Sequence, residues 1–157
     1  MSEDARKVLF VCTGNTCRSP MAEGIFRHIA DDAVYQVSSA GVAAQPGSSA
    51  SRDTLNVLSD LNIGLEGFRS RMVDEDILTE AEAVFCMTEG HLEMLEMMFP
   101  EHEEKYHLVC DFVEIDGKVG ADVPDPIGMG RRAYDSVAKV LDEAVQGVIG
   151  FLDERGK

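Results

Sequence analysis

The sequence predicts an α/β fold in which a parallel sheet is covered by helices on both faces, giving three layers. Four short runs of β-branched and apolar residues alternate along the chain with segments of helical periodicity. No linker, low-complexity tract or internal repeat interrupts this alternation. The length of 157 residues suits one domain with a single core. We therefore expect residues 1–157 to form one domain.

The first predicted strand is Val8–Cys12, a short β-rich apolar run that suits a buried position. The helix after it is expected over 19–32, because Ser19 is a good N-cap residue and Pro20 suits the first helical turn. Its apolar residues recur at helical spacing at Met21, Ile25 and Ile29. A second strand at 33–39 leads into a loop rich in Gly, Ser and Pro.

The second part of the chain continues the pattern. We expect an amphipathic helix over 51–63, a strand over 82–87, a helix over 88–99, a strand over 106–112 and a helix over 133–154. The helix over 51–63 is expected to turn Leu55, Leu58 and Leu61 inward. Thr88 is the expected N-cap of its helix, and the methionines of that helix are expected to fill the core: Met94, Met97 and Met98.

Composition excludes several classes of function. The net charge of −15 disfavours partners with a phosphate backbone or an anionic membrane surface. Four cysteines do not indicate a disulfide scaffold, and the N-terminal residues lack the apolar core of a signal peptide. No apolar run approaches the ~20 residues that span a bilayer. These features predict a cytoplasmic protein with no nucleic-acid or membrane partner, and nothing in the sequence indicates its oligomeric state.

The stretch VCTGNTCRSP, residues 11–20, carries the strongest functional signal. It lies between a predicted strand and a predicted helix, at the edge of the sheet where ligands of such folds bind. Gly14 and Asn15 tolerate left-handed backbone angles, which let successive amides converge at the helix N-terminus. Arg18 adds a two-pronged cation. The predicted phosphate-binding residues are Thr13, Gly14, Asn15, Thr16, Cys17, Arg18 and Ser19.

Cys12 lies at the floor of this predicted phosphate cradle. The amides, the helix dipole and Arg18 favour its thiolate, which is a nucleophile toward phosphorus and would form a phosphocysteine intermediate. Ser19 could donate a hydrogen bond to the departing sulfur. The alternative is a buried structural cysteine, which is common for a lone residue. The ordered set of loop residues around Cys12 favours the catalytic interpretation.

The reaction also needs a group that protonates the leaving group and then activates water. Asp125 suits both steps, because it lies in the long loop over 116–130 and is flanked by two prolines that restrict its backbone. A simple turn at Asp-Pro is the alternative. Asp122 is the nearest competitor.

These residues resemble the low-molecular-weight protein-tyrosine phosphatase family. The resemblance rests on CTGNTCRSP, on SAG at Ser39–Gly41, on Met87 before a helix and on Asp125–Pro126. It implies a flavodoxin-like four-stranded parallel sheet and hydrolysis of phosphorylated proteins without a metal or other cofactor. It also implies that Cys12 is the nucleophile, Arg18 the phosphate clamp and Asp125 the general acid, and that Asn15 and Ser39 support the loop.

The family also contains protein-arginine phosphatases, and three positions favour that branch. Thr16 stands where tyrosine-directed relatives usually carry a larger aliphatic residue. Ile127–Gly128 stands where they usually carry aromatics, and Thr88 stands where an acidic residue is frequent. A phosphoaryl ring would lack stacking partners, whereas a polar phosphoguanidino group suits a hydroxyl. We therefore expect phosphoarginine as substrate, with phosphotyrosine as the alternative.

Several other interpretations stay open or are disfavoured. Cys17 is either a redox partner that forms a reversible disulfide with Cys12 or a packed thiol. Arsenate reduction is disfavoured because the separation of Cys86 and Cys110 is too long for a disulfide relay. A non-catalytic phosphoprotein-binding module is disfavoured because the nucleophile and the acid are both present. The four histidines lack metal-ligand spacing and are expected at the surface or partly packed. Phe68 occupies a position where relatives often have a histidine that supports the loop.

Overall fold

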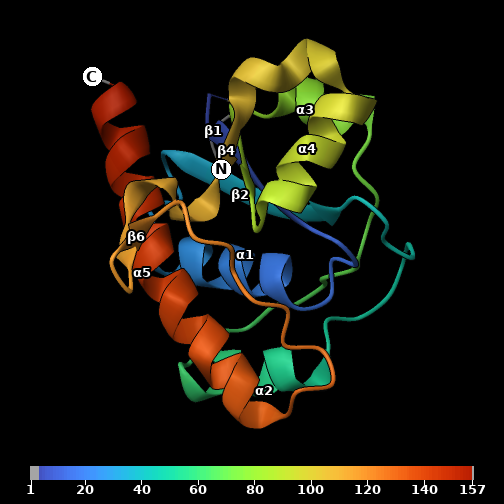
Figure 1. The fold of residues 1–157 in the computed structure, drawn as a ribbon, viewed down its shortest axis with the longest axis vertical. Coiled ribbons are helices and arrows are strands. Elements are labelled where there is room, and N and C mark those ends of the chain that lie inside the picture. Colours follow the sequence, from blue (N-terminus) through green and yellow to red (C-terminus); the bar gives the residue numbers. More distant parts are fainter. Residues whose placement is uncertain (1–3, 157) are drawn as a thin grey trace.

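The computed structural model describes residues 4–156 (Figure 1). Residues 1–3 and 157, which the single-domain prediction included, lie outside the described residues. The elements in chain order are β1 (Arg6–Cys12), α1 (Arg18–Ile29), β2 (Tyr35–Gly41), α2 (Arg52–Asp60), α3 (Glu75–Glu80), β3 (Ala83–Cys86), α4 (Glu89–Met98), η1 (Pro100–Lys105), β4 (Tyr106–Leu108), η2 (Val109–Phe112), β5 (Glu114–Ile115), β6 (Lys118–Val119) and α5 (Arg131–Arg155).

Four parallel strands form the main sheet, in the order β2-β1-β3-β4. The central strand β1 pairs Cys12 with Gly41 of β2 and Phe10 with Phe85 of β3. The prediction of a parallel α/β fold is therefore confirmed. Because β1 is central, the loop that follows it lies in the middle of the carboxyl edge of the sheet.

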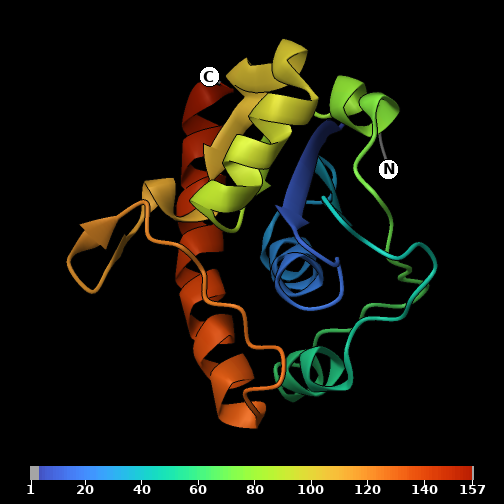
Figure 2. The ribbon, with the colours of Figure 1, turned by 45° about the vertical axis from the view of Figure 1, so that its right-hand side comes forward.

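Helices cover both faces of the sheet. Successive side chains of β1 point to opposite faces, which decides the core that each residue joins. Val8 and Phe10 face a core that includes residues of α1, α2 and α5, whereas Leu9 and Val11 face a second core with residues of α3 and α4. Figure 2 shows the long helix α5 running along one side of α1, with the β5–β6 hairpin projecting from the body. No helix of the described part of the chain is both long and apolar enough to cross a membrane.

Several predicted details of the helices are wrong. Helix α1 begins at Arg18 with Cys17 as its N-cap, whereas Ser19, the predicted N-cap, has its hydroxyl 2.9 Å from the sulfur of Cys12. The buried face of α2 is Thr54, Val57 and Leu58. Positions three apart drift around a helix of 3.6 residues per turn, which is why only the middle one of the three leucines is covered. The exposed members of the predicted apolar faces are Ile29, Leu55, Leu61, Met94, Met97 and Met98.

The predicted strand over 106–112 is also shorter than expected. β4 ends at Leu108 and the chain continues in a 3-10 turn, where the Asp111 carboxylate accepts a hydrogen bond from the Leu108 amide at 2.9 Å. The loop predicted over 116–130 contains strand β6, which forms a short hairpin with β5 just before it. Helix α3 was not predicted. Its six residues are too few to show a helical period.

Gly147 of α5 permits a close contact between this helix and η2. A Cβ atom at Gly147 would lie 2.3 Å from the carbonyl oxygen of Phe112. We therefore expect Gly147→Ala to lower the free energy of unfolding by about 1–3 kcal/mol, because the backbone must shift to remove the clash. Urea denaturation followed by circular dichroism measures the change.

Gly150 provides the matched control on the same helix, because nothing lies within 4 Å of a Cβ atom built there. Gly150→Ala should stabilise the protein by up to about 1 kcal/mol, since alanine loses less backbone entropy in a helix. Equal effects of the two substitutions would contradict the close packing of α5 against η2.

Candidate active site

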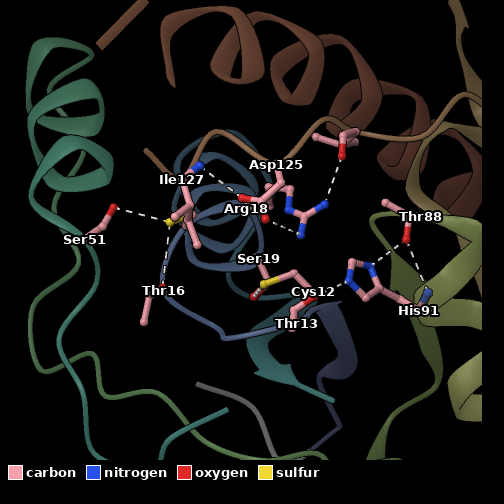
Figure 3. A network of polar contacts seen from close by, with 12 residues as sticks. Cys12, Thr13, Thr16, Arg18, Ser19, Ser51, Thr88, His91, Asp125 and Ile127 are labelled. Carbon is pink, nitrogen blue, oxygen red and sulfur yellow. Dashed lines mark hydrogen bonds and ion pairs between the residues drawn. The ribbon is translucent and has the colours of Figure 1, made fainter. Parts of the chain in front are cut away.

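The loop between β1 and α1 forms one side of a small pocket at the carboxyl edge of the sheet (Figure 3). The pocket has a volume of about 130 Å³. Its lining residues are Cys12, Thr13, Gly14, Thr16, Cys17, Arg18, Asp125 and Ile127. The structure thus brings Asp125 to the loop, although more than a hundred residues separate them in the chain. Asn15, Ser19 and Ser39, also predicted for the site, are buried behind the pocket.

The carbonyl oxygens of the loop point away from the pocket. Those of Cys12, Thr13 and Thr16 accept hydrogen bonds from the amides of Val42, Ala43 and Ser51, at 3.0, 3.0 and 2.8 Å. Among the described residues, the amides of residues 14–17 have no protein acceptor. A run of free amides at a helix N-terminus binds anions, because the N–H groups and the helix dipole both favour negative charge.

Gly41 makes this arrangement possible. A Cβ atom on Gly41 would lie 2.3 Å from the carbonyl oxygen of Thr13 and 3.1 Å from the amide nitrogen of Asn15. Only glycine therefore lets the end of β2 lie against the loop closely enough for the amides that follow it to bond the loop carbonyls. The conformation of the loop depends on the sequence of a neighbouring strand.

Asn15 holds the loop from behind with a fully buried side chain. Its backbone has a φ of 57°, in the left-handed region that asparagine tolerates better than most residues. Its side-chain amide donates to the hydroxyl of Ser19 at 2.8 Å and to that of Ser39 at 2.9 Å. Its carbonyl oxygen accepts from the backbone amide of Arg71 at 2.9 Å. The predicted contact between Asn15 and Ser39 is present, and Arg71 reaches the loop although Phe68 cannot.

The Asn15 amide, whose carbonyl oxygen accepts from Arg71, fixes the direction of the hydrogen bonds to Ser39 and Ser19. Ser39 accepts from Asn15 and donates to the buried carboxylate of Glu23 at 2.7 Å. Ser19 also accepts from Asn15, and the nearest acceptor for its own proton is the Cys12 sulfur at 2.9 Å, whereas the Ala40 carbonyl oxygen lies 3.5 Å away. A hydrogen bond donated to sulfur stabilises the thiolate over the thiol.

Arg18 connects the loop to the segment that carries Asp125. Its guanidinium donates to the carbonyl oxygen of Val123 at 3.0 Å, and lies 3.7 Å from the Asp125 carboxylate. Val123 is fully buried and its amide bonds to Met87, so the segment is fixed at this point. Asp125 itself has a half-exposed side chain at the pocket, where it can meet a substrate.

The competing aspartate, Asp122, has a different contact. Its carboxylate accepts a hydrogen bond from the backbone amide of Glu89 at 2.9 Å, in the first turn of α4. It does not line the pocket. The geometry therefore favours Asp125 over Asp122 as the group that could exchange a proton with a bound molecule.

His91 is a buried polar residue beside the loop, so the prediction that it lies at the surface or only partly packed is wrong. Its Nε2 lies 2.8 Å from the Thr13 hydroxyl, and its Nδ1 lies 3.1 Å from the hydroxyl of Thr88, the N-cap of α4. Burial, and to a smaller extent the charge of Arg18, lowers the pKa of His91 to about 4. The imidazole is therefore neutral near pH 7.

The four cysteines are free thiols in the structure. Cys17 is buried, and its sulfur lies 3.3 Å from the hydroxyl of Tyr134 and 3.6 Å from that of Ser51. Burial raises the pKa of Cys86 and brings that of Cys110 to about 11, which keeps both protonated. Within residues 4–156, no group of three or more His, Cys, Asp or Glu side chains is arranged to hold a metal ion.

The residues that the sequence analysis missed share one property: they make contacts that only the fold creates. Glu23, Arg71 and His91 bond to Ser39, Asn15 and Thr13, respectively. The sequence did contain a signal that His91 lies near the site. His91 comes three residues after the predicted N-cap Thr88, and the helix that starts there follows the carboxyl end of a predicted strand. Glu23 and Arg71 gave no such signal, because their roles depend on contacts across the fold.

Comparison with known proteins places the chain among phosphatases. The family model described as "Low molecular weight phosphotyrosine protein phosphatase" matches residues 7–157. A protein-arginine-phosphatase of Bacillus subtilis (strain 168) is 34% identical over 141 residues, covering 88% of this chain and 91% of that protein. A low molecular weight protein-tyrosine-phosphatase of Streptomyces coelicolor is 31% identical over 156 residues, covering 95% and 94%.

Solved structures agree with these relatives. The YwlE arginine phosphatase from Geobacillus stearothermophilus superimposes with a TM-score of 0.86 at 34% identity, over 96% of this chain and 94% of that chain. A YwlE variant described as having a phosphorylated active-site serine gives a TM-score of 0.84 at 32% identity, over 94% and 95%. A phosphoryl group on the side chain at that position is the product expected of a covalent mechanism.

The buried bonds of Asn15 generate a prediction about loop stability. Asn15→Gly removes the three side-chain hydrogen bonds but keeps the left-handed backbone accessible, whereas Asn15→Ala also disfavours that backbone. We expect both to lower the free energy of unfolding, with Asn15→Ala lower by about 1 kcal/mol more. Urea denaturation gives the values.

Asn62 supplies the control, because it is exposed and also has a positive φ, of 62°. Asn62→Gly should change the free energy of unfolding by less than about 0.5 kcal/mol. If Asn15→Gly proved as mild as Asn62→Gly, the buried hydrogen bonds of Asn15 would not stabilise the loop.

Proposed function

The chain belongs to the low molecular weight phosphotyrosine protein phosphatase family, and we propose that its preferred substrate is phosphoarginine in proteins. It is a cysteine-dependent protein phosphatase that acts through a phosphocysteine intermediate. Phosphotyrosine is the alternative, since relatives of both kinds match nearly the whole chain. We also propose that residues 1–157 act as one phosphatase domain.

The pocket lining is the observation that supports phosphoarginine. None of its residues is aromatic. A phosphotyrosine ring would therefore gain no stacking there, a contribution worth about 0.5–1.5 kcal/mol. Thr16 lines the pocket with its hydroxyl 3.7 Å from the Cys17 sulfur, and Ile127 is 59% exposed at the pocket. A phosphoguanidino group can bond to a hydroxyl and a carboxylate while its flat apolar face lies against an aliphatic side chain.

In the first step of the proposed reaction, the Cys12 thiolate attacks phosphorus and an S–P bond forms. The P–N bond to the guanidino nitrogen breaks, its electron pair stays on nitrogen, and Asp125 protonates that nitrogen. For phosphotyrosine the broken bond would be P–O. The amides of the loop and Arg18 receive the phosphoryl oxygens and stabilise the charge that they carry in the transition state.

In the second step, water attacks the phosphorus of the phosphocysteine while Asp125 removes a proton from it. The P–S bond breaks and inorganic phosphate leaves. The sulfur departs as a thiolate, and the Ser19 hydroxyl stabilises it from 2.9 Å. No metal takes part in this scheme, since protein amides, Arg18 and Asp125 supply the charge stabilisation and proton transfer.

The proposal also covers the partners of the protein and its location in the cell. The substrates are phosphorylated proteins, and the acidic chain has neither nucleic acid nor a membrane as a partner. A reducing cytoplasm suits a nucleophile that must stay a thiolate. Cys17 would serve as a redox partner for Cys12, which requires its sulfur to leave Tyr134 and Ser51.

The direct test compares two peptides of identical sequence that carry phosphoarginine or phosphotyrosine at one position. We expect a higher kcat/KM for the phosphoarginine peptide, measured as released phosphate. Cys12→Ser should show no turnover of either peptide, because the serine hydroxyl is a poor nucleophile without a base. Preference of the wild-type protein for phosphotyrosine would refute the proposed specificity and leave the phosphatase activity standing.

Thr16 is the proposed selector between the two substrates. Thr16→Ile should lower kcat/KM for the phosphoarginine peptide by about fivefold, because one hydrogen bond is worth about 1 kcal/mol and 1.4 kcal/mol corresponds to a factor of about ten. It should raise kcat/KM for the phosphotyrosine peptide, since the added apolar surface can contact the ring. Unchanged efficiencies for both peptides would show that Thr16 does not select the substrate.

A further inference from the structure

His91 reaches the phosphate-binding loop from the opposite layer of the fold. It lies on α4, whereas the loop leads into α1 on the other face of the sheet. Both of its ring nitrogens contact hydroxyl groups, Nε2 that of Thr13 at 2.8 Å and Nδ1 that of Thr88 at 3.1 Å (Figure 3). Its residue is 6% exposed. A buried imidazole with contacts at both nitrogens is fixed in position and in rotation.

Counting donors and acceptors assigns the proton of this imidazole. The Thr88 hydroxyl accepts from the backbone amide of His91 at 3.2 Å, as the N-cap of α4. Its own proton needs an acceptor, and Nδ1 of His91 lies beside it. Nδ1 then carries no proton, so the neutral ring holds its proton on Nε2 and donates it to Thr13. The hydroxyl proton of Thr13 remains available to the pocket that Thr13 lines.

We propose that His91 is a positioning residue of the phosphatase reaction, acting through Thr13 on the first residue after the nucleophile. This inference rests on the proposed role of the loop as the phosphate-binding site, and not on the choice between phosphoarginine and phosphotyrosine. Asn15 connects the loop to β2 and α1. His91 restrains the loop from α4, the side that the Asn15 bonds do not reach.

The charges around His91 agree with the assigned neutral form. Arg18 faces it from α1, and Asp122 and Asp125 face it from the segment before α5. Burial and Arg18 disfavour the imidazolium more strongly than the two carboxylates favour it, which lowers the pKa of His91 to about 4. A cation at His91 would add positive charge beside the phosphate cradle, whereas the neutral ring acts only through its hydrogen bonds.

The experiment uses the full chain and p-nitrophenyl phosphate, which reports turnover whichever phosphoresidue is preferred. His91→Leu removes the ring nitrogens, and Thr13→Val removes the hydroxyl with little change in shape. His91→Gln places an amide N–H near the position of Nε2 and serves as the conservative variant. His28→Leu is the matched control, because His28 is an exposed histidine on α1. The thermal midpoint of each variant is measured first. Its kcat and KM are then measured well below that temperature.

We expect His91→Leu and Thr13→Val each to lower kcat/KM about tenfold, in line with one lost hydrogen bond in a closed site. The double variant should also lose about tenfold, because the second change removes a bond already absent. His91→Gln should recover activity to within about threefold of wild type, and His28→Leu should match wild type. Histidine ¹⁵N shifts should place the His91 proton on Nε2 in the wild-type protein.

Opposite results overturn the inference. An additive loss of about a hundredfold in the double variant would mean that the two side chains act independently. A lower melting temperature for His91→Leu with unchanged kcat/KM would assign it a purely structural role, and a proton on Nδ1 would refute the donor assignment. Turnover that survives Cys12→Ser would instead refute the phosphatase assignment itself, so the two failures are distinguishable.

Discussion

The pocket at the carboxyl edge of the sheet depends on one backbone constraint: the loop after β1 must turn its carbonyl oxygens away from the pocket. The amides of Val42, Ala43 and Ser51 bond three of those oxygens, and the left-handed conformation of Asn15 turns the chain between them. Within the described part of the chain, the amides of residues 14–17 are then left without a protein acceptor. Electrostatic stabilisation of this kind is effective because the donors are oriented before a charged group arrives.

Arg18 shows how this constraint extends to the acid. One side chain presents a cation to the pocket, bonds the carbonyl oxygen of Val123 and lies 3.7 Å from Asp125. Arg18 therefore holds the segment that carries the proposed acid beside the loop. The net charge of −15 makes this placement more important, since most of the surface repels anions and the pocket must attract one locally.

Much of the fold could be predicted, because buried parallel strands and amphipathic helices leave periodic patterns in the sequence. Cys12, Arg18 and Asp125 could be predicted as candidates, since reactive residue types stand in short ordered motifs, and the structure brings the three to one pocket. Glu23 and Arg71 could not be identified, because their contacts depend on residues that only the fold brings together, whereas His91 stood three residues after a predicted N-cap. The end of β4 was missed for a local reason: the Asp111 side chain competes for the Leu108 amide.

The two hydrogen bonds that the Asn15 amide donates have a consequence for how the enzyme rests between turnovers. Hydrolases built on serine need a neighbouring base to remove the proton of the nucleophile at the moment of attack. Here Ser19 accepts from Asn15 and has its own proton 2.9 Å from the Cys12 sulfur beforehand. A hydrogen-bond partner for the sulfur is thus in place before any substrate binds, and the proposed acid, Asp125, is not needed as a base toward Cys12.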